Sequence, residues 1–364
     1  MAGRIVLFGA TGYTGELTAR ALVQQGARPV LAARSRDRVE VLGAELGGLQ
    51  TAVADVGRQA SVNALVERGD VLVSTVGPFA RWGEPALRAA IAGGAHYIDS
   101  TGEPTFIRTV FERHGAAAET AGSGLLTAFG YDYVPGNLAA ALALREAGER
   151  AVRVDIGYFV RGDAQVSGGT RASGVGMLAE PGYAFRGGRL VSERAARSVY
   201  RIDGRQAISI GATEQFVLPR VHPGLRDVRV GLGWFGAAAR PLQAISAITA
   251  LATKLPGVRA AIGAAAGRLV KGSTGGPDAA TRAKTTSQIT AVASDADGTP
   301  LATVRLQGIN PYDFTADMLA WGAIRAAGGE LLGAGALGPV DAFGLDVLER
   351  GAAQAGLRRS DETA

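Results

Sequence analysis

The first third of the chain alternates short apolar runs with segments of helical periodicity. The apolar runs fall at residues 5–8, 29–32, 50–54, 71–76, 96–99 and 124–128. The helical segments between them fall at residues 16–25, 36–46, 60–67, 85–92 and 104–121. Alternating strands and helices are typical of a parallel sheet with crossover helices. The pattern therefore predicts an α/β domain with a doubly wound parallel sheet over residues 1–135.

The pattern changes after residue 135. Longer apolar runs predict strands at residues 152–160, 199–210, 213–218 and 228–234, and a hairpin of strands 285–294 and 301–307. Helical periodicity is found at residues 170–178, 241–270 and 315–327. We therefore expect a second α+β domain over residues 136–314, with a mixed or antiparallel sheet. The tail at 358–364 is expected to be disordered.

A glycine-rich turn lies between the first strand and the first helix. Its residues are Gly9, Ala10, Thr11, Gly12, Tyr13, Thr14 and Gly15. Glycine lets a backbone turn sharply and approach a pyrophosphate, while the amide groups that begin the helix face the negative charge. A glycine triplet alone is a weak signal, but this position in an alternating pattern favours a dinucleotide site in a Rossmann domain.

The end of the second predicted strand indicates which dinucleotide is bound. NAD enzymes place a carboxylate there for the ribose hydroxyls, whereas this chain has Arg34, Ser35 and Arg38. Guanidinium and hydroxyl groups suit a 2'-phosphate, so we predict NADP(H). The alternative is an exposed basic loop in an arginine-rich chain.

Two further strand ends are expected to border the cofactor. Asp55 follows the third strand and is placed beside the adenine, or else serves only as a helix cap. Val76, Gly77 and Pro78 follow the fourth strand, where the strand order of such sheets reverses, and are predicted to line the path to the nicotinamide.

Composition limits the classes of function. The chain has 364 residues, 47% of them hydrophobic, which is enough for two domains with real cores. The net charge of +5 comes from scattered arginines, so nucleic-acid binding is not expected. Strand-like sequence begins within the first eight residues without a charged leader, and we expect a cytoplasmic protein. The apolar region 244–270 contains Lys254, Pro256 and Arg259, so it is predicted to cover an apolar ligand or contact a membrane surface rather than span a membrane.

Several motifs taken in order resemble the saccharopine dehydrogenase-like oxidoreductases, and within them the trans-acting enoyl reductases of actinobacterial lipid and polyketide assembly. The matching pieces are Gly9 to Gly15, Ala33-Arg34-Ser35, Thr75 to Phe79, Tyr97-Ile98-Asp99 with Gly102-Glu103, Gly130-Tyr131-Asp132, Gly168 to Ser173, and Gly308 through Tyr312-Asp313. The resemblance implies a Rossmann domain, a mixed-sheet domain for substrate and dimerisation, and C-terminal helices at 315–357 that return to the first domain. It also implies reduction of carbon-carbon or carbon-nitrogen double bonds.

Other dehydrogenase classes are excluded by missing residues. The glycine turn also resembles that of acylphosphate reductases, which need a cysteine nucleophile, and the chain has no cysteine. Short-chain dehydrogenases need lysine four residues after tyrosine, and Lys254, Lys271 and Lys284 do not fit. A non-catalytic NADP sensor remains an alternative.

The predicted reaction is hydride transfer from NADPH to an electron-poor double bond of a small or carrier-bound substrate. The first choice is an enoyl group, and the alternatives are an imine reductase or a saccharopine-type amino acid dehydrogenase. Tyr131 and Asp132 are the leading catalytic candidates: Tyr131 donates to an oxyanion or is simply a packing aromatic.

Glu103 is predicted to bind an amine or order a water molecule, and the alternative is that it only begins a helix. Arg171 is predicted to bind a carboxylate or phosphate, and the alternative is a surface ion pair. The three histidines are isolated in the sequence, and no metal site is expected.

Overall fold

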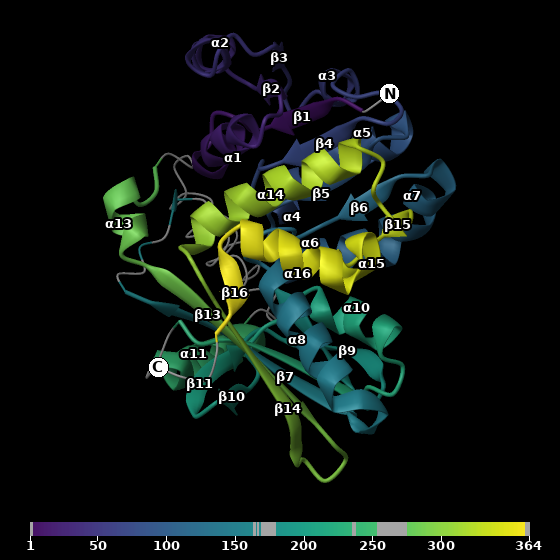
Figure 1. Ribbon diagram of the computed structural model, residues 1–364, viewed down its shortest axis with the longest axis vertical. Coiled ribbons are helices and arrows are strands. Elements are labelled where there is room, and N and C mark those ends of the chain that lie inside the picture. The colour runs from purple at the N-terminus through teal and green to yellow at the C-terminus, as the bar shows by residue number, and fades with distance from the viewer. Residues whose placement is uncertain are drawn as a thin grey trace. The chain divides into compact units, whose positions relative to one another are not determined.

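The computed structural model describes residues 3–162, 165, 167–168, 180–234, 238–252 and 275–360 (Figure 1). The chain folds into two compact units. Unit 1 contains Met1–Gly102, Phe106–Val134 and Pro311–Ala355, and unit 2 contains Glu103–Thr105, Pro135–Asn310 and Gly356–Ala364. The chain therefore leaves unit 1 near residue 135 and re-enters it at Pro311.

Unit 1 is built on a seven-stranded sheet in the order β15-β6-β5-β4-β1-β2-β3, with every neighbouring pair parallel. The strands are β1 (Ile5–Phe8), β2 (Val30–Ala33), β3 (Thr51–Val53), β4 (Val71–Ser74), β5 (His96–Asp99), β6 (Gly124–Leu126) and β15 (Gly335–Ala336). All four residues of β1 and of β4 are buried, so both faces of the sheet are covered. The strand order reverses between β1 and β4, which is where such sheets bind ligands. The predicted parallel sheet is confirmed.

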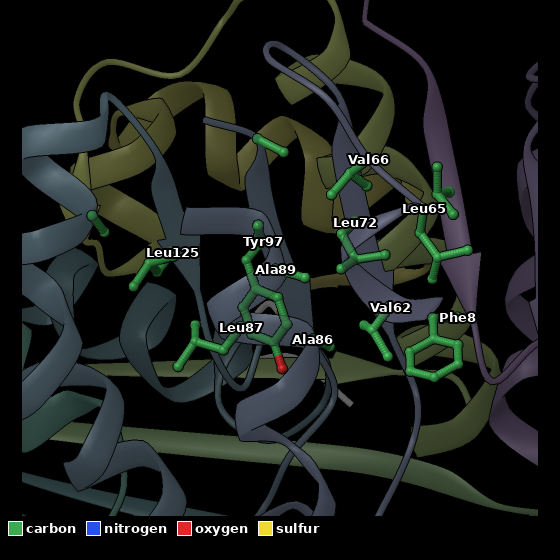
Figure 2. Close-up of a cluster of buried hydrophobic side chains, with 14 of the residues drawn as sticks. Phe8, Val62, Leu65, Val66, Leu72, Ala86, Leu87, Ala89, Tyr97 and Leu125 are labelled. Carbon is green, nitrogen blue, oxygen red and sulfur yellow. The ribbon is translucent and has the colours of Figure 1, made fainter. Parts of the chain in front are cut away.

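Helices cover the sheet of unit 1. Residues of α3 and α5 bury side chains against Phe8, Leu72 and Tyr97 of the sheet, and Figure 2 shows this core. Helix α14 packs beside α1 and crosses β1, β4 and β5 (Figure 1). The helical elements are α1 (Tyr13–Gln24), α2 (Arg36–Glu45), α3 (Gln59–Asn63), α4 (Phe79–Trp82), α5 (Glu84–Gly93), α6 (Pro104–Thr109), a π-helix (Val110–His114), α7 (Gly115–Ala121), α14 (Pro311–Ala327), α15 (Pro339–Phe343) and α16 (Leu345–Gln354).

Unit 2 is built on a nine-stranded mixed sheet. Its main path runs β10-β11-β12-β7-β13-β14-β16, and β8 joins through β12 and pairs with β9. Only β12 and β7 pair in parallel among these strands. The strands are β7 (Arg153–Arg161), β8 (Pro181–Arg186), β9 (Arg189–Arg194), β10 (Val199–Ile202), β11 (Arg205–Ser209), β12 (Asp227–Leu232), β13 (Thr286–Ser294), β14 (Pro300–Gly308) and β16 (Leu357–Arg359). The predicted mixed sheet and its β13–β14 hairpin are confirmed.

The described helices of unit 2 differ in part from the prediction. They are α8 (Val134–Ala147), a 3-10 turn (Gly148–Arg150), α10 (Glu214–Val221), α11 (Ala239–Ala252) and α13 (Ala279–Ala283). The predicted strand 213–218 is therefore wrong. Its β-branched and aromatic residues favour a strand locally, but Glu214, Val217 and Leu218 are buried at helical spacing. Tertiary packing thus overrides the local preference.

Buried polar contacts hold α10 in place. The Tyr158 hydroxyl donates to Oε1 of Glu214 at 2.7 Å and accepts from the backbone amide of Gly136 at 2.8 Å. Glu214 and Tyr158 are fully buried. Because buried polar groups need partners, these bonds join α8, β7 and α10.

Replacing Gly136 with alanine is expected to destabilise unit 2 by about 3 kcal/mol. A Cβ there would lie 2.2 Å from the Tyr158 hydroxyl and 2.3 Å from Oε1 of Glu214. Urea unfolding measures the loss. Gly333→Ala is the control, since its nearest neighbour would be 3.6 Å away, and equal stability of the two variants would contradict the prediction.

Other differences come from turns that periodicity does not resolve. The predicted strand 199–210 is two strands, β10 and β11, separated by a turn at Asp203 and Gly204, which both have positive φ. The β8–β9 hairpin and helix α8 were not predicted. Arg358 and Arg359, assigned to a disordered tail, belong to β16, which pairs with β14. The predicted helix 170–178, and the part of 241–270 beyond residue 252, lie outside the described residues.

Candidate functional site

The glycine turn joins β1 to α1 in a conformation that requires glycine at its two ends. Gly9 has a φ of +93°, and a Cβ on Gly15 would lie 2.1 Å from the Gly9 carbonyl oxygen. The amide of Gly12 donates to that same oxygen at 2.9 Å. Gly12 precedes α1 and provides no side-chain cap. The start of α1 therefore presents main-chain amides where an anion such as a pyrophosphate binds.

The end of β4 lies against this turn. The Thr75 hydroxyl donates to the carbonyl oxygens of Phe8 at 3.3 Å and Gly9 at 3.2 Å. A Cβ on Gly9 would approach Cγ2 of Val76 to 2.9 Å. Gly77 is exposed, and Val76 and Pro78 are partly exposed. The structure thus brings the start of the 76–78 segment to the glycine turn at the point where the strand order reverses.

The segment after β2 carries groups that the protein itself does not use. Arg34 is exposed and makes no ion pair or hydrogen bond to a residue that the structure describes. Ser35 occupies the position before α2, yet its side chain makes no capping bond. Arg38 donates from Nη2 to the Thr11 carbonyl oxygen at 2.8 Å, which ties α2 to the glycine turn. A guanidinium and a hydroxyl are thereby available beside the dinucleotide turn.

Asp55 has a local role in this structure. Its Oδ1 accepts from the amide of Gly57 at 2.8 Å, and the Ser61 hydroxyl donates to its carbonyl oxygen at 3.3 Å. These contacts form a turn before α3. The residue directly before α3 is Arg58 and the helix has no side-chain cap, so Asp55 shapes the preceding turn and does not cap the helix.

The ends of β5 and β6 are held together by a buried carboxyl group. Asp99 accepts hydrogen bonds from the amides of Thr101 at 2.8 Å and Ala128 at 2.9 Å, and from the Thr127 hydroxyl at 2.8 Å. Burial raises the pKa of Asp99 to about 6, and the hydrogen bonds oppose that rise. Ala128 has a φ of +57°, which costs about 1 kcal/mol for a non-glycine residue. Asp99 thus fixes the loop that carries Tyr131 and Asp132.

Asp132 has the most perturbed environment among the predicted catalytic residues. Its carboxyl group makes no hydrogen bond or ion pair with any described residue, and burial alone raises its pKa to about 7. The residue nevertheless keeps part of its surface exposed. A Cβ on Gly102 would lie 2.9 Å from Asp132 Oδ2, so a side chain there would displace this carboxyl group. Asp132 is therefore a carboxylic acid that can exchange protons near neutral pH.

The other three candidates are placed differently. Tyr131 is only 2% exposed, and its amide donates to the Thr315 hydroxyl at 3.0 Å. Glu103 is 4% exposed, directly precedes α6, and belongs to unit 2, whereas Tyr131 and Asp132 belong to unit 1. Arg171 lies outside the described residues. Sequence reasoning did not single out Asp99 or Thr315 as functional, although Asp99 could have been noticed because it ends a strand of a parallel sheet.

The remaining expectations concern metals and membranes. Within the described ranges there is no group of three or more His, Asp or Glu residues arranged to hold a metal ion. No helix in that part of the chain is both long and apolar enough to cross a membrane.

Comparison with known families bears on the cofactor turn. Residues 5–124 match the family model of the saccharopine dehydrogenase NADP binding domain. Residues 5–124 of unit 1 are thus similar to that NADP binding domain. The match agrees with the resemblance predicted from the sequence and supports NADP(H) as the cofactor.

Two mycobacterial relatives are named after the same activity. A Mycobacterium tuberculosis protein provisionally named a trans-acting enoyl reductase is 39% identical over 184 residues, which is 48% of this chain and 44% of the relative. The trans-acting enoyl reductase of Mycobacterium leprae is 39% identical over 140 residues, 37% of this chain and 34% of the relative. The matched segments thus span less than half the length of these relatives.

A solved structure supports the fold over the whole chain. Saccharopine dehydrogenase (L-Glu forming) from Saccharomyces cerevisiae, in its apo form, aligns with 99% of this chain and 100% of its own, with a TM-score of 0.56 and 12% identity. At this identity the likeness concerns the fold alone. It agrees with a Rossmann-type parallel sheet followed by a mixed sheet.

Proposed function

We propose that this protein is an NADPH-dependent oxidoreductase that reduces the carbon-carbon double bond of an enoyl thioester carried by another molecule. The NADP-binding domain and the names of the mycobacterial relatives support the reaction class. The carboxyl group of Asp132, unpaired among the described residues and with a pKa of about 7, is the observation that carries the proposal. Reduction of an enoyl group needs one proton, and Asp132 can supply it.

The cofactor is assigned to the turn and segments described above. The amides that begin α1 would hold the pyrophosphate, and Arg34 and Ser35 would hold the 2'-phosphate, with Arg38 keeping α2 against the turn. Val76, Gly77 and Pro78 would line the nicotinamide side. NADPH supplies the hydride when it is bound.

The chain's own contribution to the chemistry is a proton and its placement. Hydride addition at the β carbon would leave an enolate, whose α carbon needs one proton. Protonated Asp132 would donate that proton, and the resulting carboxylate would regain a proton from solvent. Asp99 keeps the Asp132 loop in place through its three accepted hydrogen bonds.

Consumption of NADPH tests this function directly. The substrates are enoyl thioesters of pantetheine and of a carrier protein, and cyclic imines and saccharopine form the second panel. We expect turnover with the enoyl thioesters only. Turnover with imines alone would favour the carbon-nitrogen alternative, and tight NADPH binding without turnover of any compound would favour a sensor.

The pH dependence of kcat is expected to report Asp132. A group that donates a proton must be protonated, so kcat should be level below about pH 6 and fall about tenfold per pH unit above about pH 7. Rate measurements across this range check the prediction. Asp99→Asn, which removes another raised carboxyl pKa in unit 1, should leave the decline near pH 7 in place. A rate that increases through pH 7 would instead indicate a carboxylate beside an iminium ion.

The proposal includes a cytoplasmic, homodimeric protein whose 244–270 region meets an apolar partner or membrane surface. Support comes from α11, where the side chains of Ile245, Ile248 and Leu251 are 50%, 69% and 68% exposed. Vesicle sedimentation of the wild-type protein and of Ile248→Ser tests membrane contact. Equal binding of both proteins would exclude a role for this face, and sedimentation equilibrium tests the dimer.

A further inference from the structure

We propose that Thr315, in the first turn of α14, is a positioning residue for the Tyr131–Asp132 segment, and that this turn supports the cofactor side through a separate contact. The inference rests on the proposed function, because it assigns Thr315 the task of placing the proposed proton donor. It concerns residues of unit 1 only.

The Thr315 hydroxyl bridges two main-chain groups. It donates to the Pro311 carbonyl oxygen at 2.7 Å and accepts from the Tyr131 amide at 3.0 Å. The first bond closes the opening turn of α14, and the second joins that turn to a residue 184 positions earlier in the chain. Because its proton is used toward Pro311, the oxygen is oriented to accept from Tyr131. The residue that follows Tyr131 is Asp132.

The loop backbone packs closely against Thr315 beside this bond. A Cβ on Gly130 would lie 2.7 Å from Cγ2 and 2.9 Å from Oγ1 of Thr315. Gly130 is buried, and Tyr131 is 2% exposed. The backbone of the loop is therefore pressed against α14, with the hydroxyl as its polar attachment. Asp132 has no side-chain partner of its own among the described residues, so its position depends on the backbone on either side.

The same turn of α14 also contacts the glycine turn. The rings of Tyr312 and Tyr13 meet edge to face, with centroids 5.2 Å apart and planes at 85°. Helices α1 and α14 continue this contact along their length (Figure 1). One helical turn thus supports the cofactor turn through Tyr312 and the proton-donor loop through Thr315. The two contacts should be separable by mutation.

Thr315→Val and Thr315→Ser distinguish the hydroxyl from the volume of the side chain. Valine keeps the shape and removes the hydrogen bonds, whereas serine keeps the hydroxyl. In the full-length protein we expect Thr315→Val to lower kcat about tenfold, which corresponds to one lost hydrogen bond, with the Kd for NADPH unchanged. Thr315→Ser should retain both constants. Tyr312→Leu should show the opposite pattern, with weaker NADPH binding and a kcat at saturating NADPH close to wild type.

Hydrogen exchange at the Tyr131 amide, followed by NMR, measures the positioning without any substrate. We expect faster exchange in Thr315→Val and wild-type protection in Thr315→Ser. The proposal is overturned if exchange does not change in Thr315→Val, if exchange increases while kcat stays at the wild-type value, or if kcat and NADPH affinity decline by the same factor.

Failure of the proposed function would be recognised separately. If wild-type protein reduces no enoyl thioester, the enoyl reductase assignment is wrong. The positioning claim is then decided by carbon NMR of the Asp132 carboxyl group together with the exchange data. A changed titration midpoint in Thr315→Val, restored in Thr315→Ser, supports the claim, and identical titrations in all three proteins overturn it.

Discussion

Replacing Asp132 with asparagine is expected to stop enoyl reduction while making the folded protein more stable above pH 7. Removal of a general acid lowers kcat by a factor of about 10² to 10⁴. Asparagine has nearly the same size as aspartate, so the room beside Gly102 is preserved and the Kd for NADPH should not change. Steady-state NADPH consumption and a binding titration measure the two quantities.

The stability gain follows from the direction of the pKa shift. Burial raises the pKa of Asp132 from 3.8 to about 7 in the folded protein. Between about pH 4 and pH 7 the unfolded state loses its proton while the folded state keeps it, so the wild type loses stability as pH increases. Above pH 7 the carboxyl group of Asp132 is ionised in both states, so the whole cost of burying that charge lowers the stability of the folded wild type. Three pKa units correspond to about 4 kcal/mol, and partial exposure reduces the expected gain of the asparagine variant to about 2 kcal/mol.

Thermal unfolding at about pH 5 and pH 8 checks this expectation. The variant should unfold at a higher temperature than wild type at pH 8, and the difference should shrink at pH 5. Asp317→Asn is the matched control, because burial and the charge of Asp313 raise the pKa of Asp317 to about 6. That variant should gain stability without losing turnover. Full activity of Asp132→Asn would contradict the assignment of Asp132 as the proton donor.

Replacing Arg34 with alanine is expected to weaken NADPH binding about 30-fold to 100-fold and to leave NADH binding unchanged. A charge-assisted bond between a guanidinium and a phosphate contributes about 2–3 kcal/mol, and NADH lacks the 2'-phosphate. Arg34 makes no hydrogen bond or ion pair with described residues, so its removal should not disturb the fold. Binding titrations with both coenzymes measure the ratio of their dissociation constants.

Arg36→Ala is the control for the loss of one positive charge from this segment. Arg36 is exposed on the same segment, but its Nη1 pairs with Glu40 at 3.3 Å. Its removal should lower NADPH affinity only slightly. Equal losses for NADPH and NADH in Arg34→Ala would show that Arg34 contacts a part common to both coenzymes, and the 2'-phosphate assignment would be wrong.

Local patterns were sufficient to predict the first six strands of unit 1 but not β15, α15 or α16. Each of its first six strands is a short apolar run followed by a helix, so hydrophobic periodicity reveals both the elements and their parallel arrangement. The glycine turn was equally visible, because the conformation of Gly9 and the close approach at Gly15 permit no other residue. In unit 2 the same method failed at 213–218, where burial of Glu214 against Tyr158 decides for a helix.

For the candidate site, the sequence predicted which residues are candidates but not which groups surround them. Arg34, Ser35 and Asp132 could be named from their positions after strands. Whether their side chains are available to a ligand could not be predicted, because this depends on which groups from other parts of the chain contact them. In the structure the Ser35 side chain does not cap α2, and Asp132 has no partner among the described residues. The pKa of Asp132 likewise follows from the protein packed around it.

Residue order was enough to predict the Rossmann-type sheet, the dinucleotide turn and a site for a 2'-phosphate, because each prediction depends on neighbours within a few residues along the chain. Folding in three dimensions was needed to reveal that Asp99 fixes the loop that carries Tyr131 and Asp132, and that Thr315 accepts from the Tyr131 amide. The bonds concerned join residues 29 and 184 positions apart, and no local pattern records a contact of that range.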